Sequence, residues 1–192
     1  MSDRMKMNPP PLWYVLGLPD SVVAASPDGR EALTEFALQE GAAKAVPIDT
    51  AQIVVSEQVR YKCQYGCRYF QRNKMCPPNT PPVAEFRDVV RRYQKALLVR
   101  AEPEKLHELI LKLEREAFLL GHPLALGLLE GPCSLCEKCP GPNAPCLQPE
   151  KARPSMEAMA IDVFRTCANA GLELQILTDR AERYLATGLI LF

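Results

Sequence analysis

The spacing of apolar residues divides the chain into alternating helices and strands from about residue 27. Apolar positions three and four apart predict four helices, three of which end at a glycine. We expect these helices at about 27–41, from 82, at 104–121 and at 155–171. Short apolar or β-branched runs between them predict strands at 51–59, 95–102, 123–131, 172–178 and 188–192.

This alternation predicts an α/β (α+β) sandwich, in which helices pack on a sheet of about four or five strands. The final run, GLILF, is expected to form a strand at the edge of the sheet. The first 26 residues are expected to form an N-terminal arm, and residues 27–192 a single domain. A composition that is 47% hydrophobic is sufficient for a core at this length.

Residues 131–154 interrupt the pattern with the sequence GPCSLCEKCPGPNAPCLQPEKARP, which has few apolar residues that could pack. A structureless loop of this length within a compact domain is uncommon and is usually functional. Its cysteines follow the spacing C-x2-C-x2-C-x6-C and are Cys133, Cys136, Cys139 and Cys146. Thiolates this close in sequence can fold around an inorganic centre, which then cross-links the loop.

Residues 60–82 form a second unusual stretch, with Cys63, Cys67 and Cys76 at the spacing C-x3-C-x8-C-P-P. We expect both cysteine stretches to leave the end of a strand and to enter a helix. Three thiolates leave one coordination position open, or they borrow a ligand from the other loop. The second arrangement would make one seven-cysteine region with two centres.

The spacing of the later cysteines favours an iron–sulfur cluster over zinc. Structural zinc sites typically use two C-x2-C pairs separated by a longer spacer. Three cysteines at successive intervals of three instead resemble the run that wraps a [4Fe-4S] cluster in bacterial ferredoxins, although here the fourth cysteine follows later. Zinc remains the alternative for this loop, and for the first trio a cluster and a zinc staple both remain open.

Cys167 lies outside both stretches, on the apolar face of a predicted helix. Free cysteine is a common core residue, so we expect it to be buried and not to be a ligand. His107 and His122 also lie outside the loops and are not expected to bind metal.

Charge and hydropathy limit the possible partners and compartments. The 23 basic residues balance the 23 acidic ones, which argues against nucleic acid as a partner. The chain has no apolar run long enough to span a membrane and no secretory signal pattern, so we expect a soluble, cytoplasmic protein. Thiols stay reduced in that compartment, and eight cysteines there indicate metal ligands or redox groups more than disulfides.

The first cysteine stretch is rich in cations, with no carboxylate among them: Arg60, Lys62, Arg68, Arg72 and Lys74. They could stabilise an anionic cluster, with Arg72 and Lys74 as cofactor-binding candidates, or dock a redox partner protein or a small-molecule electron acceptor. A solvated basic loop is the simpler alternative. The interleaved aromatic residues are expected to shield the centre from water: Tyr61, Tyr65, Tyr69 and Phe70.

Arg153 follows the last cysteine of the second loop, just before a helix that Ser155 is expected to cap. Its guanidinium could reach a cluster sulfur, a substrate carboxylate or a neighbouring acid. We therefore regard Arg153 as a third cofactor-binding candidate. A salt bridge that fixes the loop is the alternative.

Together these motifs resemble a prokaryotic family of predicted metal-binding proteins, known as domain of unknown function 2284. The resemblance covers about residues 30–180 and depends on R-N-x-M-C-P-P, followed by C-x2-C-x2-C-P and P-E-x-A-R-P-S-M-E-A. It implies a metal or iron–sulfur site with seven cysteine ligands: Cys63, Cys67, Cys76, Cys133, Cys136, Cys139 and Cys146. No reaction is assigned to that family. The chain departs from the pattern at Ala160, where glycine is usual, and in a shorter spacing between its first two cysteines.

These observations favour a cytoplasmic iron–sulfur protein, with one or two [4Fe-4S] clusters, that transfers electrons or serves as a small redox component. A zinc-binding interaction module without redox chemistry is one alternative. A redox enzyme with an open iron site at the first trio is another. The sequence has no Gly-rich phosphate loop and no Ser/His/Asp set, so hydrolase and nucleotide-binding functions lack support.

Overall fold

The computed structural model describes residues 29–179 and 183–192, so the expected N-terminal arm lies outside the described residues. Its centre is an antiparallel sheet with the strand order β1-β2-β4-β3. The strands in these ranges are β1 (Lys44–Asp49), β2 (Lys95–Ala101), β3 (Leu126–Leu128) and β4 (Ala186–Leu191). None of the helices in the described ranges has the length and apolar character needed to cross a membrane.

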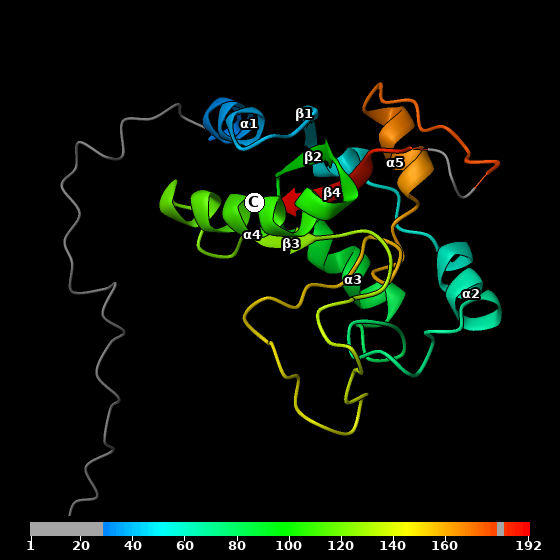
Figure 1. Ribbon diagram of the computed structural model, residues 1–192. Helices are drawn as coiled ribbons and strands as arrows, with labels where there is room; N and C mark the ends of the chain where they lie inside the picture. The colour runs from blue at the N-terminus through cyan, green and yellow to red at the C-terminus, as the bar shows by residue number, and fades with distance from the viewer. Residues whose placement is uncertain (1–28, 180–182) are drawn as a thin grey trace, which may run out of the picture.

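Helices cover both faces of this sheet (Figure 1). One face packs against α1 and α4, and the other packs against α3, α5 and the segment 155–161. The helices are α1 (Arg30–Gln39), α2 (Glu57–Gly66), α3 (Val83–Val90), α4 (Pro103–Leu119) and α5 (Val163–Asn169), with a short 3-10 turn, η3 (Thr50–Gln52). The predicted α+β class and strand number are therefore confirmed.

The two central strands are apolar because both of their faces are buried. In β2, Leu97 and Val99 face the α4 side, whereas Ala96 and Leu98 face the α3 side. All six residues of β4 are buried, and β4 pairs with β2 on one side and β3 on the other. The prediction that GLILF lies at a sheet edge was therefore wrong. A buried apolar run indicates coverage by other elements, but it does not identify the neighbouring strands.

The long predicted helix is confirmed as α4. The apolar spacing predicts six residues on one face, and five of them are buried: Leu106, Leu109, Ile110, Leu113 and Ala117. The sixth, Leu120, is the C-cap residue and is only partly buried. Pro103 occupies its first turn, and Gly121 follows its end with a φ of 95°. Local periodicity was sufficient to predict this helix because a single face of it makes the contacts with the core.

Two predicted strands do not form. Within 51–59, Val55 makes only an isolated bridge with Ile161, and Ser56 caps α2 by accepting a hydrogen bond from the Gln58 amide at 3.2 Å. The preceding segment, β1, is the strand instead, although it contains Pro47. Proline is tolerated there because β1 is an edge strand.

Residues 172–178 also lie outside any strand. Leu172 is buried, but the Ile176 side chain is 77% exposed. The predicted helix at 155–171 is divided as well, into a turn over 155–160 and α5, which Asp162 caps through the Arg165 amide. Ala160 separates the two pieces because its φ of 63° is left-handed, which no α-helix can continue.

Substitution of Ala160 tests this turn. Valine at a buried position with this φ should lower the free energy of unfolding by about 2 to 3 kcal/mol, because β-branched residues rarely adopt left-handed backbone. Glycine, which adopts this φ without strain, should stay within about 1 kcal/mol of the wild type. Urea unfolding of Ala160→Val and Ala160→Gly measures both. A valine variant as stable as the wild type would contradict this conformation.

Cys167 lies in the core with no exposed surface, as predicted. Burial raises the pKa of its thiol from an ordinary value of 9.0 to about 11. The neutral thiol therefore contributes its full stability below pH 9, and this contribution is lost as the pH rises toward 11.

We expect the stability advantage of the wild type over Cys167→Ala to shrink by about 2 to 3 kcal/mol across this pH interval. Urea unfolding of both proteins between pH 7.5 and pH 11 checks the expectation. A constant difference would show that the Cys167 thiol does not titrate within the fold at these pH values.

Candidate metal centre

A buried turn, Ser155–Ile161, anchors both cysteine stretches at their bases. Ile161 forms a bridge with Val55, directly before α2, and Ser155 forms a bridge with Leu129, at the end of β3. The Leu129 amide donates to the Pro154 carbonyl at 3.0 Å, and the Met156 amide donates to the Leu129 carbonyl at 2.7 Å. The two stretches therefore start from neighbouring points, although about 70 residues of sequence separate them.

The elements that flank the two cysteine stretches differ from the prediction. The first leaves a helix, because Cys63 lies within α2 and Cys67 is its C-cap residue. The second leaves β3 as expected but enters the 155–160 turn before α5 begins. The strand-to-helix setting was therefore wrong for the first stretch, because its β-branched residues form a bridge and not a ladder.

Asn73 joins the two stretches, and sequence reasoning did not identify it. Its side-chain amide donates to the Cys133 carbonyl at 2.9 Å, while its Oδ1 accepts from the Met75 amide at 3.0 Å. Its own carbonyl accepts the Cys76 amide at 3.1 Å. Only 4% of Asn73 is exposed. The Asn in R-N-x-M-C could have been recognised as a residue that typically bonds the backbone two positions ahead.

Lys74 forms the second connection between the stretches. Its ammonium donates to the carbonyls of Pro142 and Ala144, at 3.1 Å and 2.5 Å. These bonds hold the middle of the second loop against the first. Arg72, the neighbouring candidate, is an exposed residue.

The four cysteines of the second loop line one small cavity of about 20 Å³. Residues 73–75 of the first stretch close one side of it. Gln148 also lines it, with its side-chain amide 2.7 Å from the Leu135 carbonyl and 3.8 Å from the Cys136 sulfur. Gln148 is thus a second polar neighbour of the cysteines that the sequence analysis missed, and no motif marked it.

The three cysteines of the first trio differ in solvent exposure. Cys76 is 8% exposed, Cys63 is half-buried and Cys67 is exposed. The Cys63 thiol donates to the backbone carbonyl of Glu157 at a sulfur–oxygen distance of 3.9 Å. The trio therefore has one end in the protein interior and one end in contact with solvent.

Cysteines of both stretches influence the pKa of the Cys76 thiol. Burial raises its pKa to about 12, and charge on nearby thiolates adds to the effect, in the order Cys67, Cys63, Cys133 and Cys139. Burial likewise raises the pKa of Cys133, with a further contribution from the other cysteines of its loop. Uncompensated thiolates are costly in this region, so a bound cation or cluster would stabilise it.

All eight cysteines are free thiols. Within 29–179 and 183–192, no three Cys, His, Asp or Glu side chains are arranged so that they could hold a metal ion. The sulfur atoms are therefore grouped, but they are not drawn together to bonding distance. The type of donor fits a thiophilic centre, because cysteine thiolates select zinc, copper(I) and iron–sulfur clusters.

Arg153 forms a salt bridge with Glu114, which is one of the alternatives considered for it above. Its guanidinium donates to both carboxylate oxygens of Glu114 on α4, with Nε at 3.1 Å and 2.8 Å from them. Glu114 also accepts the Gly127 amide of β3 at 3.0 Å. The pair is largely shielded from solvent, with side-chain exposures of 20% and 16%. Arg153 thereby ties the end of the second loop to the sheet and α4.

Among the five cations of the first stretch, Arg60 has a structural role. Its guanidinium donates to the Thr80 hydroxyl and to the carbonyls of Pro81 and Ala158, at 3.0 to 3.2 Å. Burial lowers its pKa, which nearby anionic groups partly offset. It holds α2 against the turn that anchors both stretches.

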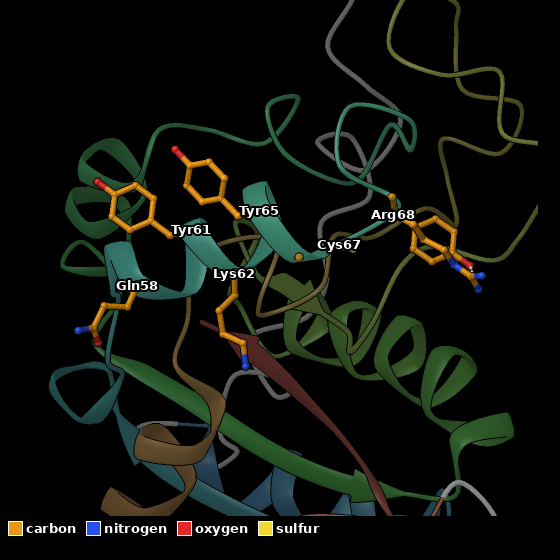
Figure 2. A pocket seen from close by; sticks show the side chains of 8 residues that line it. Gln58, Tyr61, Lys62, Tyr65, Cys67 and Arg68 are labelled. Carbon is orange, nitrogen blue, oxygen red and sulfur yellow. Dashed lines mark hydrogen bonds between the residues drawn. The ribbon is translucent and has the colours of Figure 1, made fainter.

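Helix α2 presents an aromatic and basic surface next to Cys67 (Figure 2). It buries none of its own residues, and the Tyr61 and Tyr65 side chains are 55% and 80% exposed. Their rings lie 6.3 Å apart, and Lys62 and Cys67 line the same open hollow. Tyr61 and Tyr65 therefore do not shield the cysteines from water, contrary to expectation.

A profile of a protein family, described as "Predicted metal-binding protein (DUF2284)", matches residues 46–192. The match includes all seven candidate ligands and the anchoring turn. No curated protein and no solved structure matches the chain. The left-handed φ of Ala160 is a backbone conformation that glycine adopts without strain, which agrees with the glycine that the sequence resemblance implies at this position. The chain therefore belongs to the DUF2284 family of predicted metal-binding proteins.

Proposed function

We propose that this protein is a cytoplasmic iron–sulfur protein that transfers single electrons. The observation that carries the proposal is the arrangement of the cysteines: four line one cavity, and residues 73–75, directly before Cys76 of the first trio, close one side of it. Membership in a predicted metal-binding family supports metal binding in general. The choice of iron and sulfide depends on the C-x2-C-x2-C spacing and on the all-thiolate donor set.

The second loop would hold one [4Fe-4S] cluster through Cys133, Cys136, Cys139 and Cys146. Its backbone has few apolar contacts, so inorganic atoms would supply cross-links that the core does not. The first trio would hold a second centre. When bound, such clusters accept and donate single electrons.

Residues around the loops would set the potential and the position of the cluster. The side-chain amide of Gln148 lies 3.8 Å from the Cys136 sulfur, and amide donors near sulfur stabilise the reduced form. Asn73 and Lys74 fix the distance between the two loops. Arg153 would act through Glu114 by fixing the end of the second loop, and not by contact with sulfur.

The α2 surface would receive the electron acceptor, either an acidic redox protein or a small anionic molecule. Lys62 and Arg68 are exposed beside Cys67, and no carboxylate lines this hollow. Positive charge at the solvent end of a redox site steers anionic reactants toward it.

Metal analysis tests the central proposal. Protein purified without oxygen should be brown, absorb near 400 nm, and contain several irons and sulfides per chain. Colourless protein with stoichiometric zinc would instead establish the zinc module, which requires only tetrahedral thiolates.

Substitution of Cys136 tests the second loop as a ligand set. Cys136→Ser should remove about half of the iron if two centres are present, because serine binds iron–sulfur clusters poorly. The buried Cys167→Ser is the matched control, because Cys167 lies apart from both loops, and it should keep its full iron content. Equal iron content in both variants would exclude Cys136 as a ligand.

Charge reversal tests the α2 surface. Stopped-flow oxidation of dithionite-reduced protein by ferricyanide should slow roughly tenfold at low salt in Lys62→Glu/Arg68→Glu, because attraction of the anion is lost. Oxidation by hexaamminecobalt(III), a cation, should instead become faster. Lys44→Glu, on β1 at the edge of the sheet, should change neither rate by more than about twofold. The same rates in all proteins would show that electrons leave elsewhere.

A further inference from the structure

The first trio lacks a fourth donor in its own sequence. Cys63, Cys67 and Cys76 lie on α2 and on the loop that follows it, and the remaining candidate cysteines line the cavity of the second loop. A four-coordinate centre at the trio would therefore need a ligand from elsewhere in the fold.

The anchoring turn places Glu157 next to Cys63, from which it is separated by 94 residues. The Cys63 thiol contacts the Glu157 backbone carbonyl at 3.9 Å, and the Glu157 carboxylate lies within electrostatic range of the same thiol. Tertiary structure thus brings an oxygen donor next to Cys63, the half-buried member of the trio.

One oxygen of this carboxylate has no evident structural purpose. Within the described residues, Oε2 of Glu157 is buried and has no hydrogen-bond partner. Burial of a carboxylate oxygen without a partner is costly unless a donor or a cation compensates it. The terminal nitrogens of Arg60, nearby in the fold, donate to a hydroxyl and to carbonyl oxygens, and within the described residues its buried Nε has no hydrogen-bond partner either. Glu130, another carboxylate close to Glu157, accepts the Thr187 amide.

Glu157 is also held in place. The Ser155 hydroxyl accepts the Ala158 amide at 3.1 Å, and Met156 and Ala158, on either side of Glu157, are buried. The backbone of Glu157 is therefore fixed next to Cys63. A ligand that is held before the metal binds costs less ordering entropy than a mobile one.

We propose that Glu157 is the fourth ligand of the centre held by Cys63, Cys67 and Cys76. This inference rests on the proposed function, in that it requires a centre at the trio. The carboxylate oxygen would bind the metal directly, and the bound cation would compensate the buried charge. Because oxygen is a harder donor than sulfur, the trio centre would differ from an all-thiolate centre in the second loop.

Iron analysis of Glu157→Gln tests the assignment. After anaerobic reconstitution with iron and sulfide, this variant should lose about half of the iron of the wild type, because a neutral amide is a poor ligand. X-ray absorption at the iron edge should show the loss of its oxygen scatterer. Glu137→Gln, an exposed carboxylate between two cysteines of the second loop, is the matched control and should match the wild type.

Glu157→Cys provides the second variant. It restores an anionic ligand, so it should recover the iron content while the oxygen scatterer is replaced by sulfur. If Glu157→Gln does not fold, recovery of iron by the cysteine variant still supports the assignment, and failure to recover it contradicts the assignment.

The outcomes separate the two proposals. If wild-type protein binds iron and Glu157→Gln has the same iron content and the same absorption spectrum, Glu157 is not a ligand, and the proposed function stands. If wild-type protein binds no metal, both proposals are overturned.

Discussion

The buried turn Ser155–Ile161 is the constraint on which the candidate metal centre depends. One of its ends pairs with Leu129 and the other with Val55, so both cysteine stretches leave the core at the same place. Met156 and Ile161 are fully buried against the α3 face of the sheet. The apolar core therefore positions the sulfur atoms indirectly, by anchoring the ends of segments that have almost no core of their own.

Between these anchors, polar contacts replace packing. Asn73 and Lys74 bond to carbonyls of the second loop, and Arg153 fastens the end of that loop to Glu114. Hydrogen bonds of this kind contribute about 1 kcal/mol each, which is little against the entropy of ordering two long loops. This balance is the physical reason why bound inorganic atoms would be an important part of the folded structure.

The three cysteines of the first trio differ in exposure, which bears on the proposed electron transfer. Cys76 is buried and follows residues 73–75, which close one side of the second-loop cavity, whereas Cys67 is exposed beside the tyrosines and cations of α2. The first trio therefore combines a buried cysteine with an accessible one, and the proposed carboxylate ligand would distinguish its chemistry from that of the second loop.

The sequence by itself determined the elements whose burial is local: α4 from its apolar stripe, β2 from its apolar run, and Cys167 as a core residue. It also identified the grouped cysteines, whose spacing is a local property. Only the tertiary structure decided that β4 is central and that Ile53–Val55 forms no ladder. The contacts of Asn73 with Cys133 and of Cys63 with Glu157 were equally beyond sequence reasoning. Periodicity indicates which face of a helix or strand is buried. Contacts between residues 60 to 94 positions apart depend instead on the packing of the whole chain.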